Sequence, residues 1–153
     1  MYKELVSQFT EENEWMIIQP PCLDNEIAVA EKAVGYSFPK ELRNLLTEMD
    51  GDKWLLWSAQ EIAQNAKGIR ESFYTLFEEG FGMEAYKNRI ERFLFFGGNG
   101  CGDYYCYRAS EDGIIDENSI YIWEHEYIGE ECCWKKVADS LAECITRCYR
   151  SEI

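Results

Sequence analysis

The feature that most constrains the fold is a run of four apolar residues, Phe93-Leu94-Phe95-Phe96. It has the length of a β-strand and is apolar on both alternating sides, so we expect it in the middle of a covered sheet. The glycine-rich segment Gly97-Gly98-Asn99-Gly100-Cys101-Gly102-Asp103 follows it, and then the aromatic segment Tyr104–Tyr107. Glycines between two strand-like segments predict a tight turn with positive φ angles, and therefore an antiparallel strand pair.

A phosphate-binding loop is the other function that such a glycine cluster can have. A dinucleotide-binding loop opens a helix, however, and a P-loop requires lysine followed by serine or threonine. Here a strand-like segment follows, so the sequence favours a turn. Asp103, at the start of the second strand, is expected either to cap this turn or to face a partner.

The remaining pattern predicts helices before the strands and one helix after them. Apolar residues spaced three and four apart are typical of amphipathic helices, and Gly113 marks a turn between two strands. This order predicts an α+β fold, with a central, mostly antiparallel sheet flanked by N-terminal helices and a closing C-terminal helix, in one domain over residues 1–153. The expected helices cover the first dozen residues, Asp24–Val34 with Asp24 as cap, a segment beginning near Pro39, Ser58 to about Phe77, and a segment beginning at Asp139 or Ser140; the other expected strands are Lys53–Trp57, Ile120–Trp123 and Cys132–Val137.

The charge is concentrated between Ala109 and Trp134, where eight residues are acidic and none is lysine or arginine. These eight supply more than half of the formal net charge of -14. Aromatic residues are mixed with them, which is unlike a disordered acidic tail and more typical of a folded surface. Such a charge disfavours binding to nucleic acid or to an anionic membrane and favours association with a cationic protein.

Cysteine and histidine content indicates neither a disulfide framework nor a metal site. The chain has seven cysteines and one histidine, and it shows no export signal at Met1–Leu5. An odd cysteine count without such a signal favours reduced, buried thiols, and zinc would require more nearby ligands. We therefore expect no metal and no cofactor. The absence of a signal peptide and of a membrane-spanning apolar segment predicts a cytoplasmic protein.

His125 lies between Glu124 and Glu126, an arrangement in which a general base is conceivable. No serine, cysteine or threonine is linked to it by a recognisable spacing, so the alternative is a histidine in a surface loop. A small hydrolase centred on His125 is kept as a third functional hypothesis.

Four blocks of this sequence resemble the SUKH superfamily, the Smi–Knr group. They are Glu31 with Gly35-Tyr36-Ser37-Phe38-Pro39, Leu42, Leu45-Leu46 and Asp50-Gly51; Phe93–Phe96 with Gly97–Asp103; Ile120–Trp123 with His125-Glu126; and Ala138–Leu141. The resemblance implies a non-catalytic protein. Bacterial members are immunity proteins that bind and neutralise a cognate toxin, frequently a nuclease encoded by a neighbouring gene, whereas fungal relatives are regulatory interaction proteins. The family's recurrent residues are mostly architectural, and here they are Gly35, Pro39, Gly51, Gly100 and Gly102.

The first hypothesis is therefore a cytoplasmic immunity protein whose acidic surface binds a basic toxin domain, expected to be a nuclease (RNase or DNase). The alternative is a non-catalytic regulatory interaction module. Within Ile120–Trp123, Tyr121 and Trp123 share one face and the two isoleucines share the other, so one of these faces must be core. The expected charge partners are Asp103, Asp116, Glu117, Glu124, Glu126 and Glu130, and the expected aromatic anchors are Tyr105, Tyr121, Trp123 and Tyr127.

Overall fold

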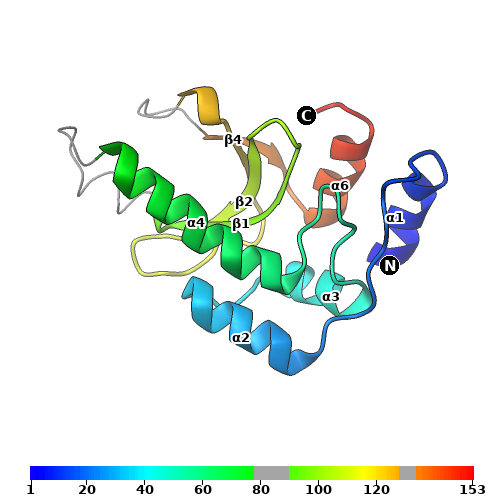
Figure 1. The fold of residues 1–153 in the computed structure, drawn as a ribbon, viewed down its shortest axis with the longest axis horizontal. Helices are drawn as coiled ribbons and strands as arrows, with labels where there is room; N and C mark the ends of the chain where they lie inside the picture. The colour runs from blue at the N-terminus through cyan, green and yellow to red at the C-terminus, as the bar shows by residue number, and fades with distance from the viewer. Residues whose placement is uncertain (78–89, 128–133) are drawn as a thin grey trace.

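The chain forms one antiparallel sheet with helices packed against it (Figure 1). The structure is a computed structural model that describes residues 1–77, 90–127 and 134–153, without the side chains of residues 73–77 and of Tyr127. The predicted α+β class and the order of the elements are confirmed. The elements are α1 (Tyr2–Thr10), α2 (Asp24–Val34), α3 (Lys40–Glu48), α4 (Ala59–Phe77), β1 (Phe93–Gly98), β2 (Tyr104–Arg108), β3 (Ile120–Trp123), the 3₁₀ helix η1 (His125–Tyr127), β4 (Trp134–Ala138) and α6 (Leu141–Tyr149).

The strands lie in the order β1-β2-β3-β4, and each neighbouring pair is antiparallel. Gly100 and Gly102 have φ angles of 75° and 98°, which confirms the predicted turn between β1 and β2. Burial of β1 along its whole length is also confirmed. Its predicted place in the middle of the sheet is wrong, because β1 is the first strand in this order.

A short segment, residues 55–57, lies along the outer edge of β1. The Gly98 N–H donates to the Leu55 carbonyl at 3.0 Å, and the Trp57 N–H donates to the Phe96 carbonyl at 3.0 Å. The strand predicted over Lys53–Trp57 is thus reduced to a single bridge between Leu56 and Gly97. This segment still satisfies backbone groups of β1 that an open sheet edge would expose.

Both faces of the sheet are covered. One face carries Leu94, Phe96, Tyr107 and the two isoleucines of β3 into the main core, which the N-terminal helices and α6 complete. On the other face Phe93, Phe95, Cys106 and Trp123 form a second cluster with Ile69 of α4 and with Ile90. Tyr104 and Trp123 stack there with 5.9 Å between their ring centroids.

The helix starts at α4 and α2 are capped by carboxylates of their own first turns. The Glu61 N–H donates to Ser58 Oγ at 3.1 Å and the Ser58 N–H donates to Glu61 Oε2 at 2.8 Å, and these two bonds form a capping box at α4. The prediction that Asp24 caps α2 is wrong, because Asp24 is the first residue of this helix and Leu23 is its N-cap. The Leu23 N–H donates to Glu26 Oε2 at 2.8 Å. A carboxylate in the first turn of the helix therefore accepts the backbone N–H of the residue before it.

The cysteines within the described ranges are all free thiols. Cys22, Cys106, Cys144 and Cys148 are buried, and Cys101 is exposed in the turn between β1 and β2. The expectation of reduced, buried thiols is therefore confirmed for four of the five described cysteines. Cys132 and Cys133, predicted at the start of the last strand, lie outside the described residues.

Candidate protein-binding surface

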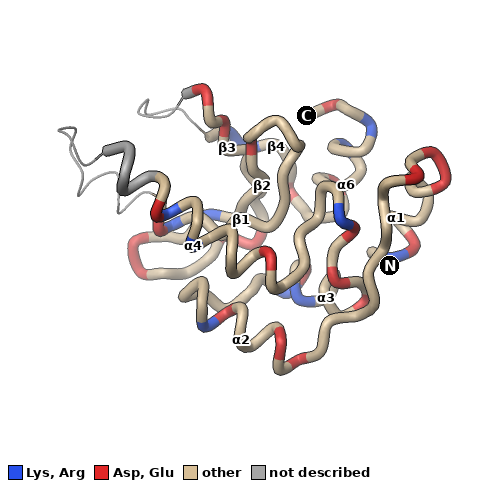
Figure 2. Tube along the Cα trace, viewed as in Figure 1, with Lys and Arg blue, Asp and Glu red and all other residues tan. Residues whose placement is uncertain are grey.

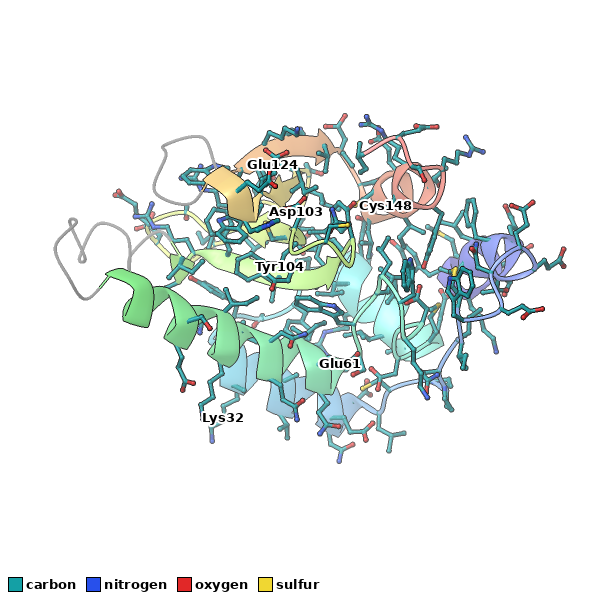
Figure 3. The ribbon with its side chains drawn as sticks, turned by 45° about the horizontal axis from the view of Figure 1, so that its top comes forward. Lys32, Glu61, Asp103, Tyr104, Glu124 and Cys148 are labelled. Carbon is teal, nitrogen blue, oxygen red and sulfur yellow. The ribbon has the colours of Figure 1, made fainter. Side chains whose placement is uncertain are left out.

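The predicted partner residues come from two regions of the fold. Asp103, Glu124 and Glu126 lie at the end of the sheet where β2 begins and β3 ends, and Figure 3 shows Asp103 and Glu124 there. Asp116 and Glu117 lie in the loop between β2 and β3. Glu130 lies outside the described residues, as does the side chain of Tyr127. The predicted set is thus divided between two surfaces rather than gathered on one.

Asp103 links the turn between β1 and β2 to the segment that follows β3. Its Oδ1 lies 2.8 Å from His125 Nδ1 and accepts the His125 backbone N–H at 3.1 Å. Its Oδ2 accepts from the Asn99 side chain at 3.1 Å. The imidazole packs over Gly102, where an added Cβ would lie 3.0 Å from the ring. Of the two roles predicted for Asp103, the structure therefore supports capping of the turn.

The Asp103–His125 pair has the form of a carboxylate that orients an imidazole, which is one component of general-base catalysis. The same carboxylate also accepts from the Asn99 side chain and from the His125 backbone N–H, so the pair has a structural role that needs no reaction.

Within the described ranges, no group of three or more His, Cys, Asp or Glu side chains could hold a metal ion. None of the helices in these ranges is long and apolar enough to cross a membrane.

Two of the four predicted aromatic anchors are buried. Tyr105 is 1% exposed and Trp123 is 2% exposed, so neither ring is available on the surface and the prediction is wrong for both. Tyr105 faces the main core, and Trp123 faces the second cluster. Tyr121 is half-buried at the edge of that second cluster. It alone of the three anchors with described side chains remains partly accessible.

Of the two glutamates that flank His125, Glu124 forms an ion pair and Glu126 is exposed. Glu124 Oε1 accepts from Lys135 Nζ at 3.0 Å, which ties the end of β3 to β4 and neutralises part of the local charge. Glu126 is exposed. The surface at this end of the molecule is therefore less acidic than the sequence alone indicates.

The loop between β2 and β3 presents acidic side chains around an exposed isoleucine. Asp116 and Glu117 are both exposed, and Ile114 is 69% exposed. Hydrogen bonds from the Asn118 N–H and the Ser119 side chain lower the pKa of Asp116 and keep it ionised. Ile114 was not among the predicted residues. An isoleucine pair directly after an acidic turn with glycine, Glu111-Asp112-Gly113, is the sequence signal that would have indicated it.

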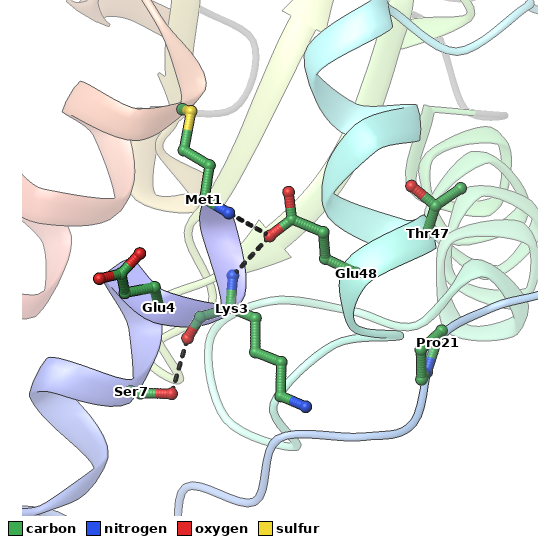
Figure 4. Close-up of a pocket in the computed structure, with 7 residues that line it drawn as sticks. All are labelled: Met1, Lys3, Glu4, Ser7, Pro21, Thr47 and Glu48. Carbon is green, nitrogen blue, oxygen red and sulfur yellow. Dashed lines mark hydrogen bonds and ion pairs between the residues drawn. The ribbon is translucent and has the colours of Figure 1, made fainter.

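Several carboxylates of this acidic chain serve as long-range caps of helix N-termini. Glu117 Oε1 accepts the Lys40 N–H at the start of α3 at 2.9 Å, and Glu41 Oε2 accepts the Leu141 N–H at the start of α6 at 2.7 Å. Glu48 accepts the Lys3 N–H and the amino group of Met1, each at 2.9 Å, in the hollow beside α1 (Figure 4). Carboxylates at such positions are favourable because unpaired N–H groups and the helix dipole meet a negative charge. Part of the net charge therefore stabilises the fold.

Replacing Asp103 with alanine is expected to destabilise the protein by about 1–2 kcal/mol at pH 7. Burial raises the pKa of this carboxyl, but hydrogen bonds from His125 and Asn99 outweigh burial and leave the pKa below its ordinary value. A folded-state pKa below the unfolded value stabilises the protein above the unfolded value, about 3.9, and this stabilisation is lost as the pH falls through the folded value. Urea unfolding of both proteins should therefore show a difference that is present at pH 5 and shrinks as the pH falls below about 4. A difference that persisted undiminished to about pH 2 would contradict the assigned contacts.

Comparison with protein-family profiles relates the chain to a known family. No curated protein matches the chain. The sequence profile of the SMI1/KNR4 family (SUKH-1) matches residues 21–147. The match runs from the segment before α2 into α6, and so includes the sheet, the Asp103–His125 contact and the loop between β2 and β3. Since it spans most of the sequence, the chain belongs to the SMI1/KNR4 family (SUKH-1).

Proposed function

We propose that this protein is an immunity protein, which binds a cognate toxin domain and neutralises it without catalysing a reaction. The observation that carries the proposal is the family match over residues 21–147, because immunity is the role that the resemblance implies for bacterial members. The imidazole of His125, the only histidine of the chain, is held by Asp103 in a contact that also fixes the loop. A binding role accounts for this arrangement at least as well as a hydrolytic one.

The charge supports a cationic partner. The chain has 29 acidic against 15 basic residues, and Figure 2 shows acidic positions on helices and loops alike. Charge of one sign accelerates encounter with a partner of opposite sign, and a toxin that acts inside the same cell must be bound quickly. We propose that the toxin is a nuclease, because a nuclease must present cations to phosphate groups. An acidic protein can occupy that surface in place of the nucleic acid.

Co-expression with the toxin domain encoded by the neighbouring gene tests the proposal. Cells that produce the toxin domain alone should lose viability, and cells that also produce this protein should regain it. With purified proteins, the nuclease activity of the toxin domain should fall when this protein is added at a 1:1 molar ratio. The association rate should fall about tenfold or more between 50 and 500 mM salt, because salt screens the attraction between the two proteins.

The outcomes separate the parts of this proposal. Toxicity that persists unchanged in the presence of this protein would reject an immunity function. Neutralisation of a toxin without nuclease activity would reject the nuclease and keep the immunity function. Stable binding to a non-toxic protein instead would favour the regulatory interaction module.

A further inference from the structure

A groove separates the loop between α2 and α3 from the loop between β2 and β3. It is lined by residues 35–39 on one side and residues 113–118 on the other, and it has a volume of about 740 Å³. These two loops are far apart in sequence and are joined at the groove by the hydrogen bond from the Lys40 N–H to Glu117. The groove is large enough to accept several side chains of a partner.

The groove combines apolar walls with negative charge. Tyr36 and Ile115, both half-buried, contribute apolar surface, whereas Asp116 and Glu117 contribute carboxylates. No lysine or arginine is among its eleven lining residues, all of which the structure describes. A surface of this kind favours a partner segment that offers an apolar side chain next to positive charge.

Ile114 is the most exposed apolar residue of this region, and it lies between two hollows. It lines the groove and also the adjacent hollow that contains Arg92 and Arg108. Both arginines already have partners within the protein. Arg92 forms an ion pair with Glu111 at 3.3 Å, and the Arg108 guanidinium lies 5.0 Å from the centroid of the Trp134 ring. A single exposed isoleucine is ordinary on a protein surface. What distinguishes Ile114 is its place on a ridge between two hollows, with carboxylates beside it.

Hydrogen bonds connect the two sides of the loop that carries Ile114 and link the loop to β2. The Ser110 N–H donates to the Ile114 carbonyl at 2.8 Å, and the Ile114 N–H donates to Ser110 Oγ at 3.3 Å. The Asp116 N–H donates to the Arg108 carbonyl at 3.1 Å, which continues the link to β2. A loop that is ordered before binding loses little conformational entropy on binding, so its contacts contribute more fully to affinity.

We infer that this groove is the docking surface for the toxin, with Ile114 as its apolar anchor and Asp116 and Glu117 as its charge partners. The occupant is a segment of the cationic toxin domain that inserts an apolar side chain flanked by lysine or arginine. This inference rests on the proposed immunity function and specifies its surface. It places the interface on the loop between β2 and β3 rather than at the Asp103–His125 end of the sheet.

The test is the variant Ile114→Lys, which removes the apolar anchor and opposes a cationic partner. The matched control is Val29→Lys on α2, because Val29 is also 69% exposed and the change in charge is the same. The probe is the catalytically inactivated toxin domain encoded by the neighbouring gene, titrated at 150 mM salt, where charges far from the interface are largely screened. Unfolding curves of both variants should match that of the parent, since both side chains are exposed.

We expect Ile114→Lys to weaken binding about tenfold or more, as truncation of an interface hot spot does, and Val29→Lys to weaken it less than about twofold. Binding of the Ile114→Lys variant with parental affinity would overturn the assigned surface and leave the immunity function intact. Equal losses in both variants would also overturn it, because they would reveal a general charge effect. If the parent itself did not bind the toxin domain, the immunity function and the docking surface would both be rejected.

Discussion

Replacing Asp52 with alanine is expected to lower the free energy of unfolding by about 4 kcal/mol, which is most of the stability of a domain at the lower end of the usual range, about 5 kcal/mol. Asp52 is fully buried. Its Oδ1 accepts three backbone N–H groups, those of Trp54, Leu55 and Leu56, at 2.8, 2.9 and 3.0 Å. Its Oδ2 accepts the hydroxyl of Tyr149 on α6. Alanine would leave these donors without acceptors, and the loss is most costly for the buried N–H groups of Leu55 and Leu56.

The effect should spread beyond the side chain because Asp52 organises a turn that several segments share. The Asp52 N–H donates to the Leu56 carbonyl at 3.1 Å, and the Asp52 carbonyl accepts the Ile17 N–H at 2.9 Å. Lys53 has a φ angle of 60°, an unfavourable conformation for a residue other than glycine. Without the carboxylate that fixes this turn, residues 55–57 would lose their alignment along β1.

Urea unfolding at pH 7 measures this effect, with two variants for comparison. Asp112→Ala removes an exposed carboxylate in the loop between β2 and β3 and should change the stability by less than about 0.5 kcal/mol. Tyr149→Phe removes one donor to Asp52 and keeps the others, so it should cost about 1–2 kcal/mol. A cost for Asp52→Ala below that for Tyr149→Phe would show that the three backbone contacts contribute little.

Asp52 also shows what the sequence could not reveal about the fold. The capping box at Ser58 and Glu61 was predictable because both partners lie within one helical turn. The carboxylate of Asp52, in contrast, depends on Tyr149, which is 97 positions away in the sequence. The position of β1 at the sheet edge was misjudged for a related reason. Apolar residues on both sides of a strand indicate that both faces are covered, but they do not reveal which segment lies along its edge.

The candidate surface was predictable only in part. Alternation along β3 correctly separated Tyr121 and Trp123 from Ile120 and Ile122. It could not indicate that α4 and Ile90 cover the aromatic face, and so it left Trp123 as a surface candidate. The number of acidic residues also could not indicate which carboxylates form contacts within the protein. Glu117 was identified as a partner residue from its charge, but the structure also uses it to cap α3 from 77 positions away.

Gly51→Ala is expected to be the second strongly destabilising change, at about 3–5 kcal/mol. Two penalties coincide at this glycine. Its φ angle is 84°, which is unfavourable for any residue with a Cβ. An added Cβ would also lie 2.7 Å from the Leu56 carbonyl oxygen and 2.8 Å from the Ser58 nitrogen, and both of these are backbone atoms. Neither atom can move without disturbing the turn held by Asp52 or the start of α4.

Gly113→Ala separates the two penalties. Gly113 has a φ angle of 78°, close to that of Gly51, but an added Cβ would meet no atom within 4 Å. This variant should therefore cost only the conformational penalty, about 1 kcal/mol, in the same urea unfolding measurement. Because the two variants share one penalty, the difference between them isolates the steric overlap with the backbone of residues 56–58. Equal costs would mean that residues 56–58 yield to the added methyl group at little cost, and the steric penalty assigned to Gly51 would be rejected.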